Sequence, residues 1–211
     1  MIQKPKAGEL TSFKLVGMCG KAGSGKDTVA DYLCHSHPAL WFMRVSLAAK
    51  VKEVARLVFD ISNHHFNNRR LKEKPLPEVS NYSPRHLAQL VGTECFRAVF
   101  GEWVWVDVLH RQLSASGFVG EVVLVTDVRY TNEMQWVLEQ GGILVYLERE
   151  QEQVISGVVR HSSEQIATIE ECQQLVQLYG GSLVVIQNNG SIKELHDAIQ
   201  KQLVPLLLTA T

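Results

Sequence analysis

The residues with the clearest chemical meaning form a glycine-rich loop near the N-terminus. The loop reads G-K-A-G-S-G-K-D-T and stands between a short apolar run and an amphipathic stretch. Glycines let the backbone N–H groups turn inward around phosphate oxygens, and a following helix presents its positive end to them. The lysine of such a loop reaches the β- and γ-phosphates of a nucleoside triphosphate. The candidate ATP-binding residues are Gly20, Lys21, Ala22, Gly23, Ser24, Gly25, Lys26, Asp27 and Thr28.

One position departs from the usual pattern G-x-x-x-x-G-K-[ST]. Asp27 stands where a serine or threonine hydroxyl normally contacts magnesium, and Thr28 is the next residue. Thr28 can supply the hydroxyl, while Asp27 can hold a water of the metal ion or cap the loop. The alternative interpretation of the whole segment is a turn rich in glycine and lysine that holds no ligand.

A second candidate carboxylate follows the apolar run E-V-V-L-V-T at residues 121–126. Asp127 lies at the end of this predicted strand, where enzymes with a phosphate loop keep a residue that orients magnesium and its waters. Arg129 is expected to project from the same edge. The alternative is that Asp127 only forms a turn. Asn132 and Glu133 are expected to begin the next helix rather than to bind a ligand directly.

The segment from Ser83 to about Phe100 is predicted to be a helix that carries a polar stripe. Ser83 is a suitable N-cap, and Pro84 suits the first turn. Two arginines with a glutamine and a threonine can bind a phosphate and the edge of a base, since guanidinium groups bind phosphate in a bidentate manner. The stripe alone is equally consistent with a solvated helix face. Its members recur every four residues: Arg85, Gln89, Thr93 and Arg97.

Two further arginines, Arg149 and Arg160, flank a polar and irregular stretch. In an enzyme of phosphoryl transfer, arginines on a closing loop neutralise charge on the transferred group. The neighbouring His161 and Ser163 are more simply explained as a surface residue and a helix cap. The histidines at positions 35, 37, 64 and 65 lack carboxylates or cysteines at ligand spacing, so solvated residues explain them better than a metal site.

Short apolar runs alternate with helical patterns, which indicates an α/β domain with a parallel sheet. Two segments, about 60–118 and about 148–165, do not fit the alternation, and residues 60–82 are expected to be a loop. The predicted strands are 13–19, 41–47, 121–126, 143–147 and 183–186. The predicted helices are 26–34, 48–59, 83–100, 103–113, 133–140, 169–178 and 192–204, the last ended or kinked by Pro205.

Composition restricts the classes of function. The chain has 211 residues with a formal net charge of -1, so the basic excess of a nucleic-acid binder is missing. No run approaches the roughly 20 apolar residues of a membrane span. The N-terminus lacks an apolar signal core and the four cysteines are scattered, so a reducing cytoplasm is expected, without a zinc site or a disulfide framework. Residues 1–12 and the tail from Pro205 are expected to be frayed or accessory.

Taken together, four stretches resemble the phage-type deoxynucleoside monophosphate kinases, which belong to the P-loop nucleotide kinases. They occur in the order of that family and cover about residues 13–164, and the stretch from Ser83 to Arg97 is the most specific. They read G-K-A-G-S-G-K-D-T-V-A-D-Y-L; K-E followed by S-P-R-H-L-A-Q-L-V-G-T-E-C-F-R; V-T-D-V-R-Y-T-N-E; and E-R followed by R-H-S-S-E.

The resemblance implies a P-loop kinase fold, with a central parallel five-stranded sheet, helices on both faces, a helical monophosphate-binding insertion and a short lid. Residues 1–211 would form a single domain, with a core of about 13–59 and 119–208, an insertion of about 60–118 and a lid of about 148–165. It also implies transfer of the γ-phosphoryl group of magnesium-ATP to a deoxynucleoside 5′-monophosphate, with a homodimer as one possible assembly. The implied catalytic residues are Lys26, Asp127, Arg129, Arg149 and Arg160, the implied acceptor-binding residues are Lys72, Arg85, Gln89, Thr93 and Arg97, and Asp27, Thr28 and Asp127 would hold magnesium through water.

Two other classes of protein share some of these features. Phosphomevalonate kinases of the animal type have a similar phosphate loop and a strand followed by D-x-R, but the stretch from Ser83 to Arg97 favours a nucleotide acceptor. A non-catalytic nucleotide-binding module is disfavoured because Lys26, Asp127 and several arginines are retained. A DNA-packaging or helicase motor is disfavoured by the size and neutral charge of the chain.

Overall fold

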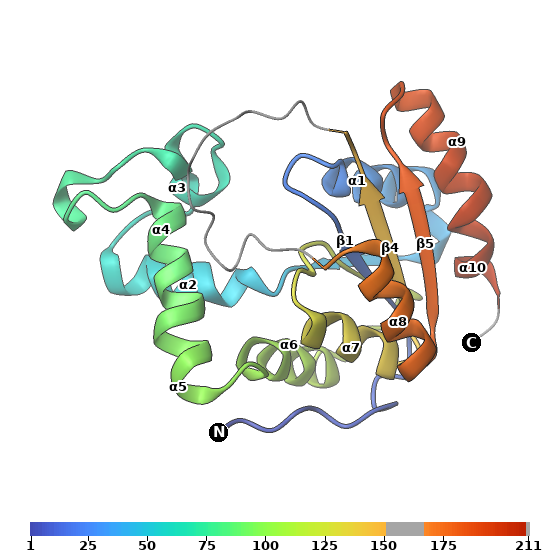
Figure 1. Ribbon diagram of the computed structural model, residues 1–211, viewed down its shortest axis with the longest axis horizontal. Coiled ribbons are helices and arrows are strands. Elements are labelled where there is room, and N and C mark those ends of the chain that lie inside the picture. The colour runs from blue at the N-terminus through green and yellow to red at the C-terminus, as the bar shows by residue number, and fades with distance from the viewer. Residues whose placement is uncertain (151–166, 210–211) are drawn as a thin grey trace. The chain divides into compact units, whose positions relative to one another are not determined.

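The computed structural model describes residues 1–150 and 167–209, and these form two compact units (Figure 1). Unit 1 comprises Met1–Pro5 and Leu47–His110. Unit 2 comprises Lys6–Ser46 and Arg111–Thr211. Helix α6 (Val104–Ala115) has residues in both. Each unit is described by itself below.

A parallel sheet forms the centre of unit 2. In the described part of this unit, five strands lie in the order β2-β3-β1-β4-β5, and every neighbouring pair is parallel. Apolar side chains fill both faces of the inner strands, as expected for a sheet that is covered on both sides. The strands are β1 (Lys14–Cys19), β2 (Phe42–Val45), β3 (Val122–Val125), β4 (Ile143–Glu148) and β5 (Ser182–Gln187).

Helices cover both faces of this sheet. Side chains of α1, α9 and α10 pack with Val16, Val145 and Ile186 in one core cluster. On the other face α7 comes close to the sheet because Gly17 has no side chain, and a Cβ there would lie only 2.9 Å from Val137 Cγ2. These helices are α1 (Lys26–Ser36), α7 (Thr131–Glu139), α8 (Ile169–Tyr179), α9 (Ile192–Gln202) and α10 (Val204–Leu208), with a 3₁₀ turn η1 (Pro38–Leu40).

Unit 1 is helical and has its own apolar core. Val51, Ala55, Phe66, Leu87 and Trp105 are among the buried side chains that pack together there. The unit contains α2 (Ala48–Phe59), α3 (Asn63–Asn67), the 3₁₀ turns η2 (Leu71–Glu73) and η3 (Pro77–Val79), α4 (Pro84–Gln89), the π-helix η4 (Leu90–Arg97) and α5 (Ala98–Phe100).

The predicted fold is confirmed: the sheet is parallel and five-stranded, and helices lie on both of its faces. The predicted strands and helices are found with ends shifted by at most two residues, because local signals mark their limits well. Ser83 caps α4 by accepting a hydrogen bond from the His86 N–H, as its position predicts. Pro205 ends α9 as expected, but it lies in the first turn of a further short helix.

Two expectations were wrong and one was incomplete. Residues 60–82 are not a plain loop, since α3, η2 and η3 fold there around the buried Phe66. The helix from Pro84 is not α-helical throughout, because its middle is η4. The N-terminal segment is not frayed: Leu10 is buried and its N–H donates to Gln140 Oε1 at 3.0 Å, a partner far away in sequence.

Among the residues with described structure, no helix combines the length and apolar character needed to cross a membrane.

Candidate functional site

The carboxyl ends of the five described strands of unit 2 meet at one edge of the sheet, and each is followed by a polar or loop residue. Strand β1 lies at the centre, and the chain continues to β2 on one side and later to β4 on the other. Such a switch point is where open α/β sheets bind ligands. The segments placed there begin at Gly20, Ser46, Thr126, Arg149 and Asn188.

The glycine-rich loop has the conformation that its sequence predicts. Gly20, Gly23 and Gly25 all have positive φ angles, of 128°, 80° and 105°. A Cβ atom at Gly20 would lie 2.3 Å from the Leu147 carbonyl oxygen, and one at Gly25 would lie 2.4 Å from Asn188 Nδ2. The loop is thus fixed by close contact with the ends of β4 and β5, where only glycine fits.

Lys26 begins α1 and places its ammonium group inside this loop. Its Nζ atom donates to the carbonyl oxygens of Gly20 at 2.6 Å and Lys21 at 2.9 Å. Burial lowers the pKa of Lys26 below its ordinary value, and the nearby positive charge of Arg129 lowers it further. Because the ammonium group is partly removed from water, it is attracted strongly by the oxygens of an anionic ligand, which take the place of water around it.

Asp127 follows β3 and is fixed by a residue from the neighbouring strand. Ser46, the residue after β2, donates its hydroxyl to Asp127 Oδ2 at 2.7 Å. The next turn is anchored by Glu133, which is buried and whose Oε2 accepts from the N–H groups of Arg129 at 2.7 Å and Tyr130 at 3.1 Å. The interpretation of Glu133 as a residue that begins helix α7 is therefore confirmed.

The two candidate magnesium carboxylates have different surroundings. The Asp27 side chain is 86% exposed and forms an ion pair with Arg44 at 3.2 Å, and Arg44 also pairs with Asp31. Asp127 is held by the Ser46 hydroxyl instead. Magnesium usually keeps several waters and takes one or two carboxylates together with substrate phosphates, so Asp127 and the hydroxyl of the half-buried Thr28 suit it. In the described ranges no three histidine, cysteine or acidic side chains gather as a metal cluster.

Arg149 approaches the loop from the end of β4. Its Nη1 atom lies 3.5 Å from the Gly23 carbonyl oxygen. The residues on both sides of it are held by the end of β5: the Asn188 N–H donates to the Glu148 oxygen at 2.8 Å, and the Glu150 N–H donates to Asn189 Oδ1 at 2.8 Å. Arg160, the other arginine expected here, lies outside the described residues, as does most of the expected lid at 148–165.

The candidate acceptor-binding residues all belong to unit 1. Arg85 Nε donates to Glu73 Oε1 at 2.7 Å, and burial together with the nearby Arg85 lowers the pKa of Lys72. Lys72 and Arg85 thus form a positively charged group within this unit. Gln89, Thr93 and Arg97 follow along α4 and η4, and all three are half-buried.

Two residues of the site in unit 2 were missed by the sequence analysis. Ser46 was placed inside a predicted strand, whereas β2 ends at Val45 and leaves it free to bond Asp127. Asn188 is buried after β5, and its Nδ2 donates to the Ser24 carbonyl oxygen at 2.8 Å. For Asn188 a signal was available, since it is a polar residue just beyond the predicted strand 183–186, whereas Ser46 fell inside the predicted strand 41–47 and carried no such signal.

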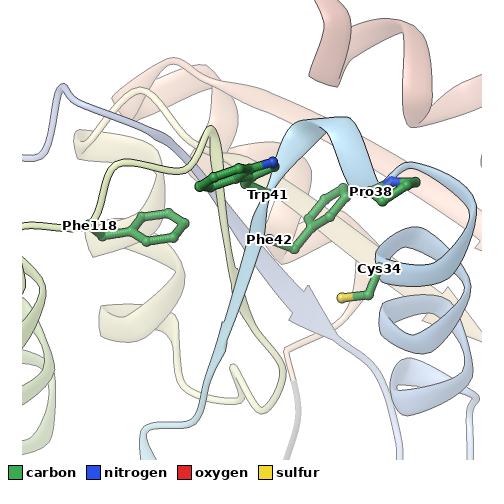
Figure 2. Close-up of a pocket in the computed structure, with 5 residues that line it drawn as sticks. All are labelled: Cys34, Pro38, Trp41, Phe42 and Phe118. Carbon is green, nitrogen blue, oxygen red and sulfur yellow. The ribbon is translucent and has the colours of Figure 1, made fainter.

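A pocket of about 350 Å³ lies at the other end of the strands. It is found where β2 begins and α1 ends, and Figure 2 shows its lining by Cys34, Pro38, Trp41, Phe42 and Phe118. Trp41 is 64% exposed. Because parallel strands begin at the edge opposite to the phosphate loop, this apolar pocket is not part of the candidate nucleotide site.

Comparison with known proteins identifies one family and several relatives. The family model described as deoxynucleotide monophosphate kinase matches residues 62–199, which is more than half of the chain and begins after the phosphate loop. A putative deoxynucleotide monophosphate kinase of Acanthamoeba polyphaga mimivirus is 26% identical over 197 residues, which covers 88% of this chain and 93% of that protein. The deoxynucleoside-5′-monophosphate kinase of Escherichia phage T5 is 26% identical over 181 residues, which covers 59% of this chain and 72% of that protein. Among solved structures, TT1252 from Thermus thermophilus is 21% identical with a TM-score of 0.48, covering 94% of this chain and 99% of that one.

Proposed function

The chain belongs to the deoxynucleotide monophosphate kinase family, and on this premise we propose that it transfers the γ-phosphoryl group of ATP to a deoxynucleoside 5′-monophosphate. The observation that carries the proposal is the common edge where Asp127 and Arg129 lie near Lys26 and Arg149 contacts the glycine-rich loop. The lysine and the two arginines provide the positive charge that phosphoryl transfer needs, and Asp127 provides a carboxylate for the magnesium ion.

Unit 2 binds the donor in this proposal. The N–H groups of the loop and the start of α1 hold the phosphates, and Lys26 exchanges its carbonyl partners for oxygens of the β- and γ-phosphates. Magnesium, when bound with ATP, neutralises charge on the phosphate oxygens. Asp127, fixed by Ser46, would hold waters of the magnesium ion, and the Thr28 hydroxyl oxygen would be a further candidate for this role.

Unit 1 binds the acceptor, through Lys72 and the polar residues of α4 and η4. An oxygen of the acceptor phosphate attacks the γ-phosphorus, the bond from that phosphorus to the β–γ bridging oxygen breaks, and ADP leaves with the bridging oxygen. The acceptor phosphate is already an anion, so no general base is required. The chain contributes alignment and charge stabilisation, through Lys26, Arg129 and Arg149 near the transferred group. Arg160 and the expected lid at 148–165 remain part of the proposal.

A coupled assay of ADP release tests this function. Purified protein receives magnesium-ATP and, separately, each deoxynucleoside monophosphate, each ribonucleoside monophosphate and mevalonate 5-phosphate. We expect turnover with at least one deoxynucleotide, and the series also measures the preference for base and sugar. Turnover with mevalonate 5-phosphate alone would assign a different acceptor. Absence of turnover with all acceptors, while ATP binds, would reject the proposed reaction.

A further inference from the structure

The helix that carries the candidate acceptor residues changes its winding in the middle. Residues Pro84–Gln89 are α-helical, Leu90–Arg97 form the π-helix η4, and Ala98–Phe100 return to α-helix. A π-helix is rare, most examples are single turns within α-helices, and these turns are frequently found at functional sites. A π-helix of eight residues, placed on the most family-specific stretch of the sequence, calls for a physical explanation.

The change of winding alters which side chains share a face. In an α-helix, a step of four residues overshoots a full turn by about 40°, so a stripe of every fourth residue drifts steadily around the helix. The i→i+5 hydrogen bonds of a π-helix wind more than four residues into each turn, so the same step falls short of a full turn. The rotation about the helix axis between Arg85 and Gln89 is therefore opposed by the step from Gln89 to Thr93 and again by the step from Thr93 to Arg97.

The π-helix thus turns a drifting stripe into a straight strip. The strip carries a guanidinium group at each end, and an amide and a hydroxyl between them, and all four side chains are half-buried. Its ends are twelve positions apart, which is at most roughly 18 Å along the axis. With the reach of the arginine side chains, this suits a ligand that has an anionic group at one end and a hydrogen-bonding edge along its length.

Contacts from other elements of unit 1 hold the π-helix in place. The indole Nε1 of Trp105, which is buried on α6, donates to the Gly92 carbonyl oxygen at 2.8 Å. On the other side Gly92 packs against α2, where an added Cβ would meet Val51 Cγ1 at 3.2 Å. Gly92 is therefore fixed between an indole donor and an isopropyl group, and neither belongs to the polar strip.

We propose that η4 aligns Arg85, Gln89, Thr93 and Arg97 into one recognition strip for the deoxynucleoside monophosphate, and that Trp105 is the positioning residue that maintains it. This inference rests on the proposed function, and it adds a residue that touches neither nucleotide. Loss of the indole N–H removes the bond that ties the Gly92 carbonyl to α6, so η4 relaxes towards α-helical winding and Thr93 and Arg97 rotate away from Arg85.

The test compares Trp105→Phe with Trp103→Phe, measuring kcat and the KM for each substrate. We expect Trp105→Phe to raise the KM for the deoxynucleoside monophosphate about three- to tenfold, with the KM for ATP unchanged. Trp103→Phe is the matched control, since that ring lies under Lys4 Nζ and it is Trp105 that donates to the Gly92 carbonyl. An unchanged acceptor KM, or an equal rise for both substrates, would overturn the inference.

A second pair of variants tests the alignment of the strip by η4 without changing a tryptophan. Gly92→Ala places a Cβ 3.2 Å from Val51 Cγ1, so η4 or Val51 must shift by a few tenths of an ångström. We expect η4 to shift and the acceptor KM to rise, and adding Val51→Ala is expected to restore it at least partly. A double variant as impaired as the single one would count against the role of η4. Wild-type protein run in parallel separates the two failures: no wild-type turnover rejects the function, whereas normal turnover with unaffected variants rejects only the inference.

Discussion

In the absence of an anionic ligand, the surroundings of Lys26 disfavour its protonated form. Burial and the charge of Arg129 both lower its pKa, so in the free protein it loses its proton at a lower pH than an ordinary lysine. Because ATP binding needs the charged form, kcat/KM for ATP is expected to fall on the alkaline side, with an apparent pKa below 10.5. Bound phosphates favour the charged form, so the alkaline fall of kcat is expected at higher pH. Rate profiles from pH 7 upwards measure both.

The variant Lys26→Ala completes this prediction. Removing one preorganised donor to a reacting oxyanion typically lowers kcat about 10²–10³-fold, and a loss of at least this size is expected here. Lys193→Ala, which removes an exposed lysine of α9, is the control and is expected to keep full activity. A near-normal rate for Lys26→Ala, or two pH profiles that coincide, would show that Lys26 does not contact the phosphates.

The sequence predicts which carboxylates lie at the strand ends, but it does not distinguish their surroundings. Asp27 and Asp127 were both magnesium candidates from their positions beside a phosphate loop and a strand end. The structure pairs Asp27 with Arg44 at the surface, while Ser46 fixes Asp127 from 81 positions away in the chain. Local patterns cannot specify partners so distant, because the pairing depends on the strand order β2-β3-β1.

At the scale of elements, the end of β5 supports the phosphate loop. Asn188 is buried, donates to the Ser24 carbonyl oxygen and packs where a Cβ on Gly25 would collide with it. Asn188→Ala leaves that carbonyl without its donor, which is expected to lower the free energy of unfolding by about 1–3 kcal/mol. It should also raise the KM for ATP, because the loop loses its fixed shape. Urea denaturation and initial-rate kinetics measure the two effects.

Gln187→Ala is the matched control for this element. Gln187 is exposed at the same strand end and bonds the Glu148 side chain, not the loop. We expect it to leave the KM for ATP unchanged. If Asn188→Ala bound ATP as well as wild type does, or if Gln187→Ala were equally impaired, the support of the loop by Asn188 would be refuted.

The same scale shows why most elements were predictable and η4 was not. Helix limits follow from nearby residues, such as the Thr168–Glu171 and Ser191–Glu194 capping boxes and the Ser83 cap. The winding of η4 depends on Trp105 and Val51, which approach Gly92 from two other helices. Apolar spacing predicts that residues 84–100 are helical, but the kind of helix is a tertiary property.

At the scale of the whole molecule, the proposed reaction divides its two substrates between two units with separate cores. Unit 2 has the sheet, the phosphate loop and Asp127, while unit 1 has Lys72 and the strip on α4 and η4. This division predicts that each nucleotide stabilises a different part of the chain. A ligand stabilises the state that binds it by about 2.7 kcal/mol when its concentration is 100 times Kd. Only local unfolding events that disrupt the binding site become less favourable by this amount.

Hydrogen exchange measured peptide by peptide tests this division. A non-hydrolysable ATP analogue is expected to slow exchange at residues 20–25 and in the first turn of α1, whereas a deoxynucleoside monophosphate is expected to slow exchange at residues 84–97. Helix α10 serves as the internal control, because it carries none of the proposed binding residues. Protection of residues 84–97 by the analogue alone, or of residues 20–25 by the monophosphate alone, would reverse the assignment of substrates to units. Because each ligand is added separately, the result is independent of catalysis and locates both substrates even if turnover is slow.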